Sequence, residues 1–117
     1  MSDWQITFYV TESGRCPVEE FFDDLPEAEM VRMDRKVRLL AALGTSIGPP
    51  HVDHLRGKIW ELRVPGRLQH RLLYVAVEER SILLLHGFTK KARKTPKREI
   101  EIAESRFNDY LERHLSS

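Results

Sequence analysis

The chain has 117 residues, of which 41% are hydrophobic and 32% charged, with a net charge of +1. This length suits one domain, because two smaller domains would each bury too little surface to be stable, and we expect a single domain over residues 1–117. The composition excludes a disordered chain. No apolar run reaches the roughly 20 residues of a membrane span and no secretory signal is visible, which predicts a cytoplasmic protein without membrane contact.

The N-terminal part of the chain predicts one strand followed by a short helix. Residues 4–10 alternate between the two sides of an extended segment, with Trp4, Ile6, Phe8 and Val10 on the apolar side. Pro17 suits the first turn of a helix, which we expect to stop near Leu25.

A longer amphipathic helix is predicted over about residues 27–43, because apolar side chains recur at helical spacing. Its apolar stripe consists of Met30, Met33, Val37, Leu40 and Ala41. Gly44 is expected to end this helix. Residues 45–54 contain Gly48 and two prolines, and we expect an exposed loop there.

Three strands and a final helix are predicted for the C-terminal half. The strands are expected over residues 58–64, 68–77 and 82–88, joined by short turns that favour antiparallel pairing. The last strand is nearly all apolar, which indicates a central position in the sheet. Thr95 and Pro96 are expected to start a helix that runs to about residue 114. The predicted fold is α+β with the order β-α-α-β-β-β-α, a curved antiparallel sheet with helices packed on one face.

Charge is unevenly distributed along the chain. Residues 12–29 are strongly acidic, whereas residues 90–98 contain six Lys or Arg in nine positions. Such a dipolar molecule offers one basic surface that could attract phosphates, although a solvated surface explains a basic run equally well. Cys16 is the only cysteine, and His51 and His54 are loosely spaced around Asp53, so we expect neither a metal nor a cofactor.

Basic residues on the strands are the first candidates for chemistry. Arg63, Arg71, Lys90 and Lys91 could hold a phosphodiester and stabilise the added negative charge of its transition state. Arg71 lies within an apolar strand, where a cation must reach solvent or find an anion. The candidates for proton transfer are His51, His54, His70, His86 and Tyr74. A histidine in a strand is more often a packed core residue, and Trp4 and Trp60 are expected to be core anchors before base-stacking platforms.

Several segments between residues 55 and 106 carry a family resemblance. They are Leu55-Arg56-Gly57, Ile59-Trp60-Glu61-Leu62-Arg63-Val64, His70-Arg71-Leu72-Leu73-Tyr74, Leu83-Leu84-Leu85-His86-Gly87-Phe88-Thr89-Lys90-Lys91, and Lys94-Thr95-Pro96 with Glu99-Ile100 and Ala103. In this order and spacing they resemble the phage-derived, HigB-type branch of the RelE/ParE toxin superfamily of type II toxin–antitoxin systems.

This resemblance implies a toxin that inhibits translation as a ribosome-dependent mRNA endoribonuclease. It also implies a cognate antitoxin, of the HigA helix-turn-helix type. Arg71 and Arg63 match basic strand positions, Lys90 or Lys91 matches a cation after the last strand, and His54 matches a histidine of some HigB-like members. Further RNA contacts are expected from Arg56, Lys58, Arg93 and Lys94.

The sequence also departs from the RelE pattern. Glu61 stands where RelE-like members have a basic residue, and a C-terminal catalytic tyrosine has no equivalent, because Tyr110 lies deep in the last helix. ParE-like relatives share the scaffold and poison DNA gyrase without cutting RNA. The alternative function is therefore a non-nucleolytic toxin or an antitoxin-bound interaction protein.

Overall fold

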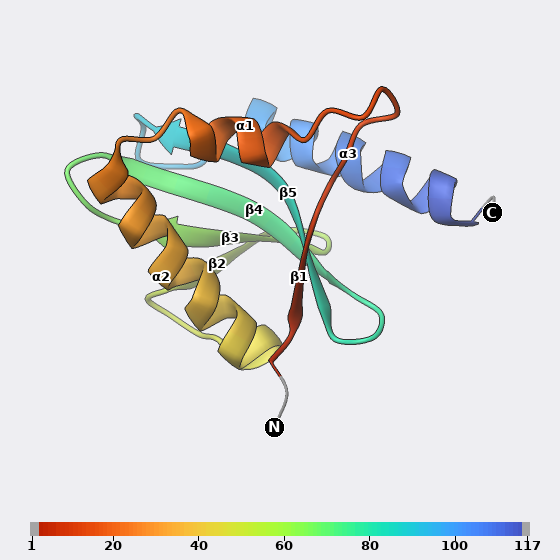
Figure 1. The fold of residues 1–117 in the computed structure, drawn as a ribbon, viewed down its shortest axis with the longest axis horizontal. Helices are drawn as coiled ribbons and strands as arrows, with labels where there is room; N and C mark the ends of the chain where they lie inside the picture. Colours follow the sequence, from red (N-terminus) through yellow and green to blue (C-terminus); the bar gives the residue numbers. More distant parts are fainter. Residues whose placement is uncertain (1–2, 116–117) are drawn as a thin grey trace.

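Residues 3–115 are described by a computed structural model of the chain. In chain order the elements are β1 (Gln5–Phe8), α1 (Pro17–Asp23), α2 (Glu27–Leu43), a 3-10 turn η1 (Gly44–Ser46), β2 (Val52–Arg56), β3 (Ile59–Val64), β4 (Gln69–Val77), β5 (Ser81–Lys90) and α3 (Lys97–Leu115). They build one five-stranded mixed sheet with helices against it, which confirms the α+β class (Figure 1). No helix within residues 3–115 is long and apolar enough to cross a membrane.

The first two helices begin and end where the sequence predicts. Pro17 is the first residue of α1, and Glu27 and Glu29 in the first turn of α2 oppose the positive end of the helix dipole. Gly44 follows α2 with a φ of +54°, and a Cβ on it would lie 2.1 Å from the Nε1 atom of Trp4. Only glycine fits this position, because both the backbone angle and the packing exclude a side chain.

The strand order is β1-β5-β4-β3-β2, with β1 parallel to β5 and every other neighbouring pair antiparallel. The expectation of a purely antiparallel sheet is therefore wrong. The segment containing α1 and α2 separates β1 from the other strands along the chain, which lets β1 pair with the last strand. β5 has a strand on each side, as its apolar sequence predicts.

Part of the expected loop over residues 45–54 forms the edge strand β2. Val52 lies opposite Leu62 in antiparallel register, and the pairing is irregular between His54 and Arg56. Of the strand's five residues only Val52 is buried. A short edge strand with one buried side chain has no clear alternating pattern of apolar residues. The Gly and Pro residues before it therefore predict a loop.

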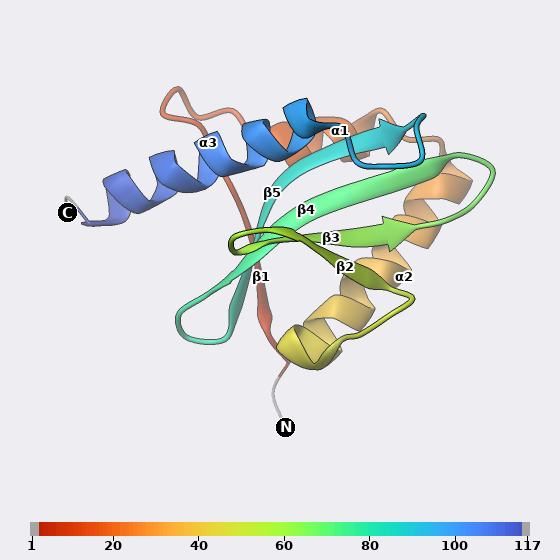
Figure 2. The same ribbon diagram turned by 180° about the vertical axis from the view of Figure 1, so that it is seen from behind.

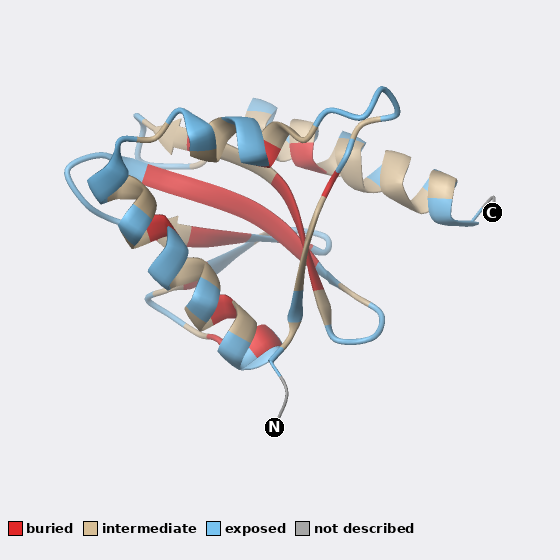
Figure 3. Cartoon of the chain, in the orientation of Figure 1, coloured by how far each residue is buried: buried red, intermediate tan, exposed pale blue. Residues whose placement is uncertain are grey.

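Helices cover both faces of the sheet, not one face as expected. One face of the sheet, called here the α2 face, packs against α1 and α2. The buried residues of this layer are Val18, Met33 and Leu40 from the helices and Leu62, Val64, Leu72, Tyr74, Ile82 and Leu84 from the strands. The opposite α3 face packs against Ala103 and Phe107 of α3, mainly through Ile59, Leu73, Val75, Leu83 and Leu85 (Figure 2). Figure 3 shows that β4 and β5 are buried along most of their length. Apolar residues on both sides of these strands need cover from two layers.

Two predicted core positions are more exposed than expected. Val10 is 42% exposed, while its neighbour Tyr9 is buried and donates a hydrogen bond from its hydroxyl to Asp109 at 2.6 Å. Trp60 is 39% exposed, because its strand lies near the sheet edge and only β2 flanks it on that side. Trp60 is therefore a surface aromatic residue, and its role as a core anchor is corrected.

Candidate phosphate-binding face

Three basic side chains come from neighbouring strands and lie on the α3 face. In the register of the sheet Arg63 lies opposite Arg71, Arg71 lies opposite Phe88, and Lys90 lies opposite Gln69. Residues opposite each other on neighbouring strands share a face, so Arg63 and Arg71 lie on the same side. Gln69 is two residues from Arg71 and therefore also lies on that side, and so does Lys90 opposite it. We refer to Arg63, Arg71 and Lys90 as the basic row.

Arg71 is the most buried member of the basic row, at 7% exposure. Its Nη1 atom donates to the carbonyl of His70 at 3.0 Å, while its Nε atom is buried without a hydrogen-bond partner within residues 3–115. Burial lowers the pKa of Arg71 and nearby Glu61 opposes this change. A guanidinium keeps its proton at neutral pH even so, because its usual pKa is far above 7.

Glu61 of β3 is the carboxylate that faces both arginines. It is 1% exposed, and its Oε1 and Oε2 atoms lie 3.7 Å from the Nε of Arg71 and 3.9 Å from the Nε of Arg63. These distances allow attraction between charges and are too long for hydrogen bonds. Two of the three cations of the row are thus partly balanced by one buried anion.

The segment before α3 is tied to this carboxylate. The hydroxyl of Thr95 donates a short hydrogen bond to Oε1 of Glu61. α3 begins at Lys97, and the carbonyl of Pro96 accepts hydrogen bonds from the amides of Glu99 and Ile100 at 3.0 and 3.5 Å. Pro96, and not Thr95 as expected, therefore precedes the first residue of the helix. Thr95 instead ties the segment after β5, which carries Lys91, Arg93 and Lys94, to Glu61 beside the row.

Arg63 is more open than Arg71 and has a second acidic neighbour. Its side chain is 39% exposed, and its Nη2 atom donates to Asp53 of β2 at 3.3 Å. The Nε atom is buried without a partner within the described residues, as it is in Arg71. Arg63 is therefore partly open to solvent, with Asp53 at its Nη2 atom and Glu61 near its Nε atom.

His86 lies on the same face, between two charged residues of α3. Its Nε2 atom donates to Glu99 at 2.7 Å, its Nδ1 atom accepts from Arg106 at 3.2 Å, and its ring stacks on Phe88 at 5.5 Å. Burial lowers the pKa of His86, although the hydrogen bond to Glu99 acts in the opposite direction. The imidazole is therefore neutral at pH 7 and has both nitrogens occupied.

Lys90 at the end of β5 and the lysines and arginine that follow it are free cations at the edge of this face. Lys90 is partly exposed, and the next ones, Lys91, Arg93 and Lys94, are exposed. None of the four makes an ion pair or side-chain hydrogen bond with any residue from 3 to 115. They are available to a phosphate without breaking an internal contact.

Two other predicted RNA-binding residues lie elsewhere. Arg56 of β2 forms a two-bond ion pair with Glu104 of α3, at 2.5 and 3.0 Å, so its charge is balanced within the chain. Lys58 is exposed in the turn between β2 and β3 and has no ion pair within residues 3–115. The structure does not bring Arg56 or Lys58 into the basic row.

Two predicted proton-transfer residues lie on the α2 face, away from the basic row. Tyr74 is buried there at 4% exposure, directly opposite Trp60 on the neighbouring strand. His54 pairs with Trp60 from the other side, and its Nε2 atom lies 2.7 Å from the carbonyl of Gly57. Of the catalytic candidates with a histidine or tyrosine side chain, only His86 shares the face of Arg71.

His70 is a packed core histidine, which is the alternative expected for a histidine in a strand. It is 2% exposed, donates to Glu29 at 2.5 Å, accepts from Thr89 at 3.0 Å and contacts the ring of Phe21. It connects α2 to the sheet. His51 accepts from Lys36 at 2.8 Å, and no group of three His, Cys, Asp or Glu residues within 3–115 could hold a metal ion.

Four residues important for this face were missed or only noted from the sequence, namely Glu61, Thr95, Glu99 and Arg106. Glu61 and Arg63 are two residues apart along β3, so the two-residue period of a strand already places them on one face. The contacts of Glu99 and Arg106 with His86 carry no local signal, because they depend on how α3 packs.

The fold and this face define a small α+β protein that presents cations from three strands and the following segment on one side of its sheet. The family model "Phage derived protein Gp49-like (DUF891)" matches residues 20–108. The chain therefore belongs to the Gp49-like family of phage-derived proteins, a toxin-like family of toxin–antitoxin systems. No curated protein matches the chain closely enough to count as a relative.

Proposed function

We propose that the chain is the toxin of a type II toxin–antitoxin pair and cleaves mRNA on translating ribosomes, as a HigB-type, single-domain protein of the cytoplasm. The observation that carries this proposal is the side-by-side placement of Arg63 and Arg71, with Lys90 on the same face. Cations on rigid strands hold a phosphate more accurately than cations on loops. Membership of a toxin-like family supports the same function.

The proposed reaction uses the RNA's own nucleophile. The 2′-oxygen attacks the neighbouring phosphorus while its proton passes to a base, the bond from phosphorus to the 5′-oxygen breaks, and that oxygen takes up a proton. The products are a 2′,3′-cyclic phosphate and a 5′-hydroxyl. Arg63, Arg71, Lys90 and Lys91 stabilise the charge that builds on the phosphoryl oxygens, which is the largest contribution such a surface can make.

His86 is our candidate for proton transfer, because it shares a face with the basic row and is neutral at pH 7. Glu99 orients the ring through Nε2, which leaves Nδ1 as the basic atom. Arg106 now donates to that atom, so substrate has to displace this 3.2 Å contact before Nδ1 can accept a proton. Arg93 and Lys94 would bind RNA beyond the cleaved bond.

One observation favours a second function, a toxin that binds without cleaving. Glu61 faces both arginines and Arg56 is paired with Glu104, so the chain neutralises part of its own basic surface. A ParE-like gyrase poison or an antitoxin-bound interaction protein would need no free phosphate site. DNA damage without mRNA cleavage in cells would identify this second function.

A toxin-like family of this kind implies an antitoxin as partner. We propose a HigA-type helix-turn-helix antitoxin that covers the basic row, in addition to mRNA and the ribosome as targets. Lys90 and the exposed lysines that follow β5 are the cations that an acidic antitoxin segment can reach without rearrangement.

The test is cleavage of a labelled mRNA in a reconstituted translation reaction. Lys90→Ala and Lys91→Ala are the main variants, since both side chains lack internal partners within residues 3–115 and their loss should not disturb folding. Arg71→Gln is expected to slow cleavage further. Arg38→Gln is the matched control, because Arg38 is exposed on α2 and pairs only with Asp34 among the described residues. Equal cleavage by all four variants and the parent would refute the assignment.

A further inference from the structure

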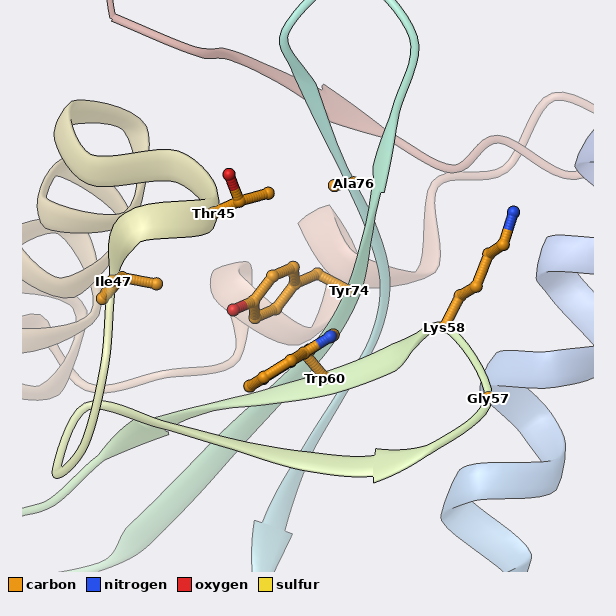
Figure 4. A pocket seen from close by; sticks show the side chains of 7 residues that line it. All are labelled: Thr45, Ile47, Gly57, Lys58, Trp60, Tyr74 and Ala76. Carbon is orange, nitrogen blue, oxygen red and sulfur yellow. The ribbon is translucent and has the colours of Figure 1, made fainter.

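A pocket on the α2 face lies outside the basic row. It has a volume of about 300 Å³ and is lined by Thr45, Ile47, Gly57, Lys58, Trp60, Tyr74 and Ala76. Figure 4 shows β3 and β4 forming one side, with the turn η1 and its following residue on the other. This volume is at the lower end of the range for small-molecule sites.

Tyr74 contributes a hydroxyl group to this pocket. The residue is 4% exposed, and its hydroxyl has no hydrogen-bond partner within residues 3–115. Figure 4 shows the hydroxyl pointing toward the segment that carries Thr45 and Ile47. Burial raises the pKa of Tyr74, so the hydroxyl stays protonated and can donate. The buried side-chain atoms without a partner among the described residues are the Nε atoms of Arg63 and Arg71, so the Tyr74 hydroxyl is open to the pocket and can donate to a ligand there.

Trp60 contributes an exposed aromatic surface beside this hydroxyl. It lies directly opposite Tyr74 across the β3–β4 pair and is 39% exposed. The ring of His54 lies 5.0 Å from it on the other side. An exposed tryptophan at the wall of a pocket provides a flat surface on which a planar ring can stack.

Lys58 is the cation among the residues that line the pocket. It lies in the turn between β2 and β3, next to Gly57, whose φ is +56° and whose carbonyl is 2.7 Å from His54. Its ammonium group has no partner within residues 3–115. The turn is therefore held in shape while its cation remains available to an anion.

We infer that this pocket binds a nucleotide, with the base stacked on Trp60, a base or sugar acceptor on the Tyr74 hydroxyl, and the phosphate at Lys58. A flat aromatic surface, a hydroxyl donor and a cation match the three chemical parts of a nucleotide. Trp60 and Tyr74 alternate with Glu61 and Leu73 along their strands, so the pocket and the basic row lie on opposite faces. This inference goes beyond the proposed cleavage reaction and does not depend on it.

The experiment is calorimetric titration of the full chain with each of the four nucleoside 5′-monophosphates, with inorganic phosphate, and with a short single-stranded RNA. Saturable binding of at least one monophosphate is expected, with no binding of inorganic phosphate alone. Binding of the RNA without any monophosphate would count against the inference, because the basic row on the opposite face can hold the RNA phosphates.

Three variants test the parts of the pocket separately. Tyr74→Phe removes one hydrogen bond and is expected to weaken binding about 2- to 13-fold. Trp60→Ala removes stacking and is expected to weaken it about 5- to 150-fold, whereas Trp60→Phe retains a flat ring and most of the affinity. Lys58→Ala is expected to weaken the binding of a monophosphate more than the binding of the corresponding nucleoside. Lys97→Ala, in the first turn of α3, is the charge-matched control and should bind as the parent does.

The inference is overturned if no monophosphate binds, or if monophosphate binding is unaffected by both Tyr74→Phe and Trp60→Ala. Far-UV circular dichroism of each variant shows that a loss is not caused by unfolding. Monophosphates lack the internucleotide phosphodiester bond that the proposed nuclease would cleave. Their binding therefore tests the pocket even if the chain proves to have no nuclease activity.

Discussion

Replacing Glu61 by glutamine tests whether this buried carboxylate limits the basic row. The three cations of the row and Glu61 together carry three positive charges and one negative charge. Glu61→Gln removes the negative charge and keeps an oxygen that can accept from Thr95. We therefore expect stability and RNA affinity to change in opposite directions.

The expected loss of stability follows from the burial of the pair. Glu61 is 1% exposed and Arg71 is 7% exposed, and their charged groups are 3.7 Å apart. Removing one partner of a buried ion pair costs about 3 to 5 kcal/mol. Because Arg63 is partly exposed and solvent screens its charge, we expect a value near the lower limit, about 3 kcal/mol. Urea unfolding followed by circular dichroism measures this change.

The expected gain is in RNA binding. With the internal carboxylate gone, a phosphate no longer competes with Glu61 for the two arginines. Fluorescence anisotropy with a labelled single-stranded RNA should show tighter binding, with a slope of log K against log salt that is steeper by about 0.7 for each added phosphate contact. Glu104→Gln is the control, because it frees Arg56, which lies outside the row. Reduced stability with unchanged RNA affinity would show that Glu61 is only a structural partner of the arginines.

Two further predictions concern His86 and Gly87. Burial lowers the pKa of His86, so its neutral form stabilises the fold above its usual pKa of about 6.5 and this contribution is lost as the pH falls below that value. Between pH 7.5 and 5.5 the parent should lose more unfolding free energy in urea than His86→Gln, and equal losses would contradict this. A Cβ on Gly87 would lie 2.5 Å from Cδ2 of Phe21, so Gly87→Ala should destabilise by about 1 to 3 kcal/mol in thermal unfolding, unlike Gly48→Ala, where nothing lies within 4 Å.

The sequence predicts elements well where the pattern is local. The amphipathic stripe containing Met33 and Leu40 defines α2, and both residues are buried as expected. The apolar run of β5 predicts its interior position in the sheet. In contrast, the parallel pairing of β1 with β5 joins residues far apart in the chain, and neither strand encodes the direction of its partner.

Residue type alone was a poor guide to the site. Arg71 and Tyr74 are three positions apart on one strand, and the alternation of side chains places them on opposite faces. His54 was expected in a loop, but its pairing with Trp60 places it near the pocket on the α2 face. The hydrogen bond from Thr95 to Glu61 spans 34 residues and depends on how the segment before α3 folds back on the sheet.

The most direct test of the central claim is primer extension on cellular mRNA after brief induction of the chain in bacteria. We expect new 5′ ends within translated regions for the parent and for Arg38→Gln, and a strong reduction of these ends for Lys90→Ala combined with Arg71→Gln. Growth inhibition by the parent without new mRNA ends, or identical ends from the double variant, would contradict a phosphate-cleaving role for the basic row.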